Sequence, residues 1–189
     1  GLAEAFTAGA RSRGANVIDI GMVSTDMLYF AVASQSLDGG AMLTASHNPK
    51  QYNGIKLVRA GAVALSGDAG IREVQEGALG EEPAPFTGPE GTLSRQDVSD
   101  AFVAHCLSFI DVSRLRPLKL VLDAGNGMAG PAAERVFAGL PFHRTDLFFE
   151  PDGDFPNHPA DPLVEENRRD IIATVKATGA DLGIAWDGD

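Results

Sequence analysis

The stretch Leu118-Lys119-Leu120-Val121-Leu122-Asp123-Ala124-Gly125-Asn126-Gly127-Met128-Ala129-Gly130-Pro131 decides the fold of this chain. Its first five residues are an apolar run of the length typical of a buried strand. The glycine-rich segment after it predicts a tight turn, and Pro131 is typical of the first turn of a helix. A buried strand, a glycine-rich turn and a helix together form the repeating unit of an α/β fold.

The same alternation continues toward the C-terminus. Residues 142–149 predict a second strand, a helix carrying Ile171 and Val175 ends at Gly179, and residues 182–186 predict a third strand. Strands that alternate with helices form parallel sheets through right-handed crossovers. Ligands bind such sheets at the carboxyl ends of the strands, which is where Asp187 and Asp189 lie.

The N-terminal half also mixes helices and strands. Its pattern predicts helices near residues 2–13, 25–33 and 66–77, and strands near 16–20, 41–44, 55–58 and 62–65. Residues 80–91 are rich in proline, glycine and acid, which is typical of a linker. A capping-box pattern at Ser94 predicts that a helix starts soon after it. We therefore expect an α/β chain of two units with mixed or parallel sheets covered by helices: domain 1 at 1–80, a linker at 81–93 and domain 2 at 94–189.

The amino-acid composition excludes some classes of binding partner. The chain has 189 residues, of which 44% are hydrophobic and 22% charged, and this is ordinary globular composition. A formal net charge of −11 argues against nucleic acid and against anionic membrane surfaces as partners. The lone cysteine, Cys106, excludes an intrachain disulfide and is expected to be a buried thiol. No run is apolar enough to span a membrane, so we expect a soluble cytoplasmic protein.

A serine loop lies between two expected strands in the first half. It reads Thr44-Ala45-Ser46-His47-Asn48-Pro49, and Asn53-Gly54 marks a turn beyond it. Pro49 keeps Asn48 out of helical space, which holds the loop open and exposes the Ser46 hydroxyl. A loop serine alone more often satisfies a nearby backbone group, and no G-x-S-x-G hydrolase elbow is present.

Five motifs in order resemble the α-D-phosphohexomutases, the phosphomannomutase/phosphoglucomutase family, and they cover nearly the whole chain. They are residues 44–49, Tyr52-Asn53-Gly54-Ile55-Lys56, Asp123-Ala124-Gly125-Asn126-Gly127, Phe155-Pro156-Asn157-His158 and Asp187-Gly188-Asp189. The resemblance implies a four-domain enzyme. This chain would hold most of its first domain and nearly all of its second, and its remaining domains would be partners supplied by the same protein.

The resemblance also implies a reaction. Phospho-Ser46 would exchange its phosphoryl group with a hexose 1- or 6-phosphate through a 1,6-bisphosphate. His47 and Asn48 would orient the phosphoserine and the phosphosugar, and Lys56 would bind substrate and act as the general acid/base. Ser46, Asp187 and Asp189 would hold Mg²⁺, while the family's third aspartate and an arginine would follow Asp189. Residues 52–54 resemble the mannose/glucose branch more than phosphoglucosamine mutase.

The residues themselves support part of this assignment. Asp187 and Asp189 flank a glycine that lets the backbone turn tightly, and carboxylate oxygens suit Mg²⁺ better than zinc. A solvated acidic turn is the alternative. Lys56 alternates with Ile55 and Leu57 along its strand, so the alternative there is an exposed lysine on a sheet face. Asp152-Gly153-Asp154 hints at calcium, but the positions after it do not fit an EF-hand.

Two other classes of function stay open at this point. Gly125-Asn126-Gly127-Met128-Ala129-Gly130 fits G-x-G-x-x-G after a strand, and Glu150 ends the next strand, as a dinucleotide-binding domain requires. A dinucleotide-binding function would leave the Ser46 loop without a role. The chain could also be a non-catalytic fragment that binds only a metal or a phosphorylated ligand.

Overall fold

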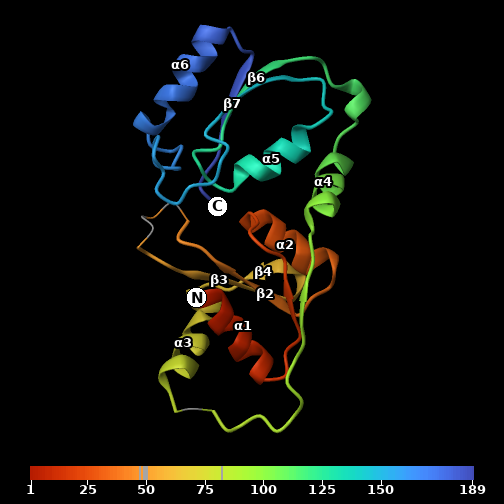
Figure 1. Cartoon of the computed structure of the whole chain (residues 1–189), viewed down its shortest axis with the longest axis vertical. Helices are drawn as coiled ribbons and strands as arrows, with labels where there is room; N and C mark the ends of the chain where they lie inside the picture. The colour runs from red at the N-terminus through yellow and green to blue at the C-terminus, as the bar shows by residue number, and fades with distance from the viewer. Residues whose placement is uncertain (47, 49–50, 82) are drawn as a thin grey trace. The chain divides into compact units, whose positions relative to one another are not determined.

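The computed structural model describes residues 1–46, 48, 51–81 and 83–189. The chain divides into two compact units (Figure 1). Unit 1 comprises Gly1–Leu43 and Gly54–Val98, and unit 2 comprises Thr44–Asn53 and Ser99–Asp189. The serine loop therefore groups with the C-terminal unit, although the strands on either side of it belong to unit 1. The expected α/β class, with parallel and antiparallel sheets and helices, is confirmed.

Unit 1 contains three α-helices and five strands among its described residues. The helices are α1 (Leu2–Ser12), α2 (Thr25–Ser34) and α3 (Arg72–Leu79), and the strands are β1 (Val17–Asp19), β2 (Gly39–Leu43), β3 (Ile55–Arg59), β4 (Val63–Ala64) and β5 (Leu93–Arg95). β2, β3 and β4 form an antiparallel sheet, while β1 and β5 form a separate parallel pair.

Helix α2 covers one face of the antiparallel sheet. Leu28 and Val32 of the helix pack against Val58 of β3, and all three side chains are buried. Gly40 of β2 lies directly beneath the helix, because an added Cβ would stand only 2.8 Å from Val32 Cγ2 and 2.9 Å from Leu28 Cδ1. A glycine at this position therefore lets helix and sheet approach closely.

The segment expected to be a linker lies along unit 1. Leu93–Arg95 pairs in parallel with β1, and the Gly91 N–H donates to the Arg11 carbonyl at 2.9 Å. Arg13 donates to the Ala84 carbonyl at 2.7 Å, and Thr92 donates to the Asn16 side chain. These contacts tie residues 84–95 to α1 and β1. The proposed limits of the two domains stay a prediction.

Unit 2 contains the parallel sheet that the sequence predicts. Its helices are α4 (Ser99–Ser108), α5 (Ala129–Phe137) and α6 (Arg169–Thr178), and its strands are β6 (Lys119–Asp123), β7 (His143–Leu147) and β8 (Leu182–Ala185). The strand order is β7-β6-β8, with both pairs parallel. Leu120, Val121 and Leu122 are at most 3% exposed, so the central strand is the core of the unit.

The order of the strands determines which face of the sheet each helix covers. The chain runs from β6 to one neighbour and then crosses back to the other, so right-handed crossovers put α5 and α6 on opposite faces. Figure 1 shows α6 on one side of the sheet and α5, with α4 against it, on the other. The reversal makes the carboxyl ends of β6 and β8 a topological switch point, where α/β sheets bind ligands.

Two local expectations, for Ser94 and Cys106, are corrected. Ser94 lies in β5 and does not cap a helix, and α4 begins at Ser99. Cys106, expected to be a buried thiol, is half-buried. Lys56 shares its sheet face with Val58, toward α2, and is half-buried, whereas Ile55 on the opposite face is 44% exposed. No helix in the described part of the chain is long and apolar enough to cross a membrane.

Candidate functional site

The serine loop follows β2 and holds its serine in an unusual backbone conformation. Ser46 has a φ of 56°, in the left-handed region that residues other than glycine rarely adopt. The Ser46 N–H donates to Thr44 Oγ1 at 2.9 Å, and the Asn48 N–H and side-chain amide both donate to the Ala45 carbonyl. Local hydrogen bonds thus stabilise the turn. His47 lies outside the described residues.

An acid loop, Asp187-Gly188-Asp189, follows β8. Gly188 is buried, Asp187 is exposed and Asp189 is half-buried. The Asp189 N–H lies 3.4 Å from Asp187 Oδ1, so the two acidic residues belong to one tight turn. Gly188 is the point at which the rest of unit 2 packs against this loop.

A glycine turn, Gly125-Asn126-Gly127, supports the acid loop from the end of β6. An added Cβ on Gly127 would stand 2.7 Å from Gly188 Cα, so only hydrogen fits between these backbones. The Met128 N–H donates to the Gly188 carbonyl at 3.1 Å, and the Trp186 N–H donates to the Asp123 carbonyl at 3.1 Å. The ends of β6 and β8 are therefore locked to each other.

The serine loop reaches the acid loop at the same glycine. An added Cβ on Gly188 would stand 3.3 Å from the Ser46 carbonyl oxygen, 3.4 Å from Ala160 Cβ and 3.5 Å from Phe155 Cζ. Two motifs separated by most of the chain thus meet within unit 2. The resemblance implied that these two motifs share a metal ion, whereas local sequence patterns alone supplied no contact between them.

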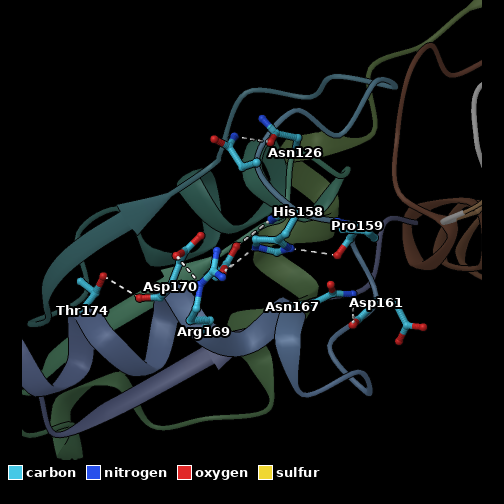
Figure 2. Close-up of polar contacts among 11 residues, drawn as sticks. Asn126, His158, Pro159, Asp161, Asn167, Arg169, Asp170 and Thr174 are labelled. Carbon is cyan, nitrogen blue, oxygen red and sulfur yellow. Dashed lines mark hydrogen bonds and ion pairs between the residues drawn. The ribbon is translucent and has the colours of Figure 1, made fainter.

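A histidine–aspartate pair, His158 and Asp123, lies at the end of β6, and Figure 2 labels His158 and draws its contacts. His158 Nδ1 is 2.8 Å from the Pro159 carbonyl oxygen, and His158 Nε2 is 3.1 Å from Asp123 Oδ2. A carbonyl only accepts hydrogen bonds, so Nδ1 carries a proton. The Asp123 side chain is 1% exposed and that of His158 13%, so the pair is shielded from water.

Asn126 organises the glycine turn from within. Its φ is 60°, and its side-chain amide donates to the Glu150 carbonyl at 2.8 Å. Its side-chain oxygen accepts from Asn157 at 2.7 Å (Figure 2). Sequence reasoning named Asn126, Asn157 and His158 only as parts of motifs. The signal that points to them is an asparagine after a strand-ending aspartate and glycine, together with a second polar loop.

The second and third glycines of the G-x-G-x-x-G motif pack against other backbone segments of the protein. A dinucleotide site needs the backbone at the second glycine to face a pyrophosphate, whereas Gly127 faces Gly188. Gly130 packs against the Phe149 carbonyl. The glycines thus allow close packing of loops and of helix on strand.

The acid loop offers oxygen donors for a cation. Within residues 1–46, 48, 51–81 and 83–189, no group of three or more His, Cys, Asp or Glu side chains is placed to hold a metal ion. Asp187 and Asp189 are two hard oxygen donors on one turn, and Ser46 lies against that turn. This donor set suits Mg²⁺ and does not suit zinc.

Comparison with known proteins assigns the chain to a family. The family model for phosphoglucomutase/phosphomannomutase α/β/α domain I matches residues 1–82, and that for α/β/α domain II matches residues 100–189. The chain belongs to the phosphoglucomutase/phosphomannomutase family. The resemblance of its five motifs is thereby confirmed.

Curated relatives carry corresponding names. The chain is 45% identical to a "Phosphohexose mutases" protein of Xanthomonas campestris pv. campestris over 188 residues, which is 100% of this chain and 42% of that protein. It is 44% identical to a phosphomannomutase of Salmonella typhimurium over 191 residues, covering 98% of this chain and 42% of that protein. The chain thus spans 42% of the length of these relatives.

Solved structures share the fold. A phosphoglucomutase/phosphomannomutase family protein from Burkholderia thailandensis superposes with a TM-score of 0.83 at 40% identity, covering 100% of this chain and 41% of that one. A crystal structure described as a putative phosphomannomutase from Thermus thermophilus gives a TM-score of 0.78 at 27% identity, covering 99% and 44%.

Proposed function

We propose that this chain carries the phosphoryl-transfer part of a phosphohexomutase that interconverts the 1- and 6-phosphates of mannose and glucose. The observation that carries the proposal is the meeting of the Ser46 backbone with Gly188 of the acid loop. A nucleophilic hydroxyl and two carboxylates that belong to one turn are the parts that metal-assisted phosphoryl transfer requires. Membership of the family supports the same reaction.

The proposed reaction begins with a phosphate ester on Ser46. The free hydroxyl of a hexose monophosphate attacks phosphorus, the bond from phosphorus to Ser46 Oγ breaks, and a hexose 1,6-bisphosphate forms. Lys56 takes the proton from the attacking hydroxyl and passes it to the departing Ser46 Oγ. The bisphosphate turns around and the Ser46 hydroxyl attacks its other phosphoryl group. Lys56 takes the proton from Ser46 Oγ and delivers it to the sugar oxygen that leaves phosphorus. Phosphate and proton are conserved over the cycle.

Other residues position the reacting groups. We assign His47 and Asn48 to orienting the phosphoserine and the sugar phosphate, with Lys56 also contacting the substrate. Ser46, through its phosphate, with Asp187 and Asp189 would hold Mg²⁺. That ion supplies charge neutralisation for the transferring phosphoryl group when bound. The left-handed backbone at Ser46 supports this assignment, because strained residues cluster at functional sites.

The proposal extends to partners and substrate. Because the chain spans 42% of its relatives, further domains of the same protein would supply the sugar and phosphate contacts. A phosphosugar is the partner, and the net charge of −11 disfavours nucleic acid. Residues 52–54 support mannose and glucose over glucosamine. We place the protein in the cytoplasm, where hexose phosphates are available.

Phosphorus NMR tests the proposal directly. The longest natural form of the protein is given Mg²⁺, a trace of hexose 1,6-bisphosphate and, in separate reactions, mannose, glucose or glucosamine 1-phosphate. We expect 6-phosphate from mannose and glucose, and none when Ser46→Ala replaces the wild type. Conversion of glucosamine 1-phosphate alone would move the protein to the phosphoglucosamine branch. Absence of conversion for all three sugars would contradict the proposal.

A further inference from the structure

The Asp123–His158 pair has no part in the reaction as proposed above, yet it is the most buried polar contact near the acid loop. Asp123 Oδ1 accepts from the Gly125 N–H at 2.9 Å, and Oδ2 lies 3.1 Å from His158 Nε2. Both carboxylate oxygens are therefore engaged, and the side chain is 1% exposed. Asp123 has no access to a metal ion or a substrate.

Both ring nitrogens of His158 are also engaged in contacts within the protein. One ring nitrogen faces the Pro159 carbonyl and the other faces Asp123, while the Phe148 ring contacts the imidazole edge to face with 5.3 Å between centroids. Neither nitrogen remains to take a proton from a substrate. Any effect of the pair on chemistry must therefore act through the backbone that it holds in place.

That backbone is the support of the acid loop. The pair joins the end of β6 to the loop at residues 155–160, and Ala160 of that loop is fully buried against both Gly125 and Gly188. From the other side, the Asp123 carbonyl accepts the Trp186 N–H, and Met128 donates to the Gly188 carbonyl. Gly188 is thus enclosed by segments that meet at Asp123 and His158.

We propose that Asp123 and His158 are positioning residues that hold the acid loop in the conformation in which Asp187 and Asp189 bind Mg²⁺. This inference rests on the proposed function. Polar contacts behind metal ligands orient those ligands, and their removal typically weakens metal binding by about ten- to a hundred-fold. Releasing the loop at residues 155–160 removes Ala160 from Gly188 and lets the two carboxylates separate.

The test measures metal binding apart from activity. Mn²⁺ is titrated into the longest natural form of the wild type, His158→Gln and Asp123→Asn, and free Mn²⁺ is followed by electron paramagnetic resonance. Thermal unfolding is recorded on the same samples. Asp146→Asn is the control, because Asp146 pairs with Arg144 at 2.6 Å on β7 and no hydrogen bond or ion pair among the described residues joins its side chain to the acid loop.

We expect both pair variants to bind Mn²⁺ about ten- to a hundred-fold more weakly, while Asp146→Asn keeps the wild-type affinity. In the mutase assay the pair variants need more Mg²⁺ for half-maximal rate, and saturating Mg²⁺ restores most of kcat. A role in folding alone would instead lower kcat at every Mg²⁺ concentration. His158→Gln changes the size of the side chain, whereas Asp123→Asn keeps it. If one variant fails to fold, the other still provides the test.

Wild-type affinity for Mn²⁺ in a folded pair variant would overturn the inference and leave the proposed function intact. A wild type that takes up phosphate on Ser46 but binds no Mn²⁺ would overturn both the inference and the Mg²⁺ assignment. A wild type that binds Mn²⁺ but never carries phosphate would contradict the proposed function, and the positioning role would still be decided by the two variants.

Discussion

At the scale of single residues, Ser46 combines a reactive hydroxyl with an energetically unfavourable backbone conformation. A left-handed residue other than glycine costs on the order of 1–3 kcal/mol and persists only when its surroundings hold it. Here Thr44 accepts the Ser46 N–H at 2.9 Å, and the Ala45 carbonyl accepts from Asn48. The Thr44 side chain therefore contributes directly to the orientation of Ser46.

Thr44→Val tests that dependence. Valine has the shape of threonine without the acceptor, and losing one hydrogen bond costs about 0.5–1.5 kcal/mol. We expect the rate of phosphoryl transfer from Ser46 to fall roughly two- to tenfold by steady-state assay, because this cost falls on the reactive conformation. Thr44→Ser keeps the oxygen and should keep the rate. Equal rates for valine and serine would show that this contact has no role.

Lys56 is the second residue whose role can be separated from folding. Removing a general acid/base typically lowers kcat by about 10²–10⁴-fold. We expect Lys56→Met to show this loss while its melting temperature stays near that of the wild type. Lys119→Met is the control, since Lys119 is an exposed lysine at the start of β6. A wild-type kcat for Lys56→Met would remove Lys56 from the proposed reaction.

At the scale of elements, the glycine turn and the acid loop pack closely against each other. A methyl group at Gly127 would stand 2.7 Å from both Gly188 Cα and the Gly188 carbonyl oxygen, so one backbone must move. We expect Gly127→Ala to weaken Mn²⁺ binding by about tenfold or more, measured by titration. Gly153→Ala is the matched control, because nothing lies within 4 Å of its added Cβ. Equal affinities would contradict close packing at Gly188.

The central strand predicts where stability resides. Leu122 is fully buried in β6, and leucine-to-alanine changes in such positions cost about 2–5 kcal/mol through lost burial and a residual cavity. We expect that loss for Leu122→Ala in urea unfolding of unit 2. Leu163 is 90% exposed, so Leu163→Ala should change stability by less than about 0.5 kcal/mol. Similar midpoints for the two variants would contradict the assignment of the core.

The elements also show what sequence patterns can predict. β6 and α5 were predictable because an apolar run, a glycine turn and Pro131 all favour the same strand–turn–helix unit. β5 was not, because its three residues are exposed and its only described strand partner, β1, lies far away along the chain. Strand alternation placed Lys56 opposite Ile55 and Leu57 but did not reveal that its face is the one that α2 covers.

At the scale of the whole molecule, each unit can be understood separately. Unit 1 pairs strands through an antiparallel sheet and a short parallel pair, whereas unit 2 is a parallel sheet with a switch point at β6 and β8. The motifs of the site were predictable because their residue types are specific. The resemblance implied that Ser46 and the acid loop share a metal ion, but the close packing of their backbones at Gly188 was not predictable, because no local pattern encodes it.

The central claim is that Ser46 carries the phosphoryl group, and intact mass spectrometry with peptide mapping tests it most directly. The protein is incubated with a hexose 1,6-bisphosphate and compared with Ser46→Ala and with Ser36→Ala, a second serine with positive φ, at 52°. We predict one phosphate on the wild type and on Ser36→Ala, mapped to Ser46, and none on Ser46→Ala. No phosphate on the wild type, or a phosphate that persists in Ser46→Ala, would contradict the account.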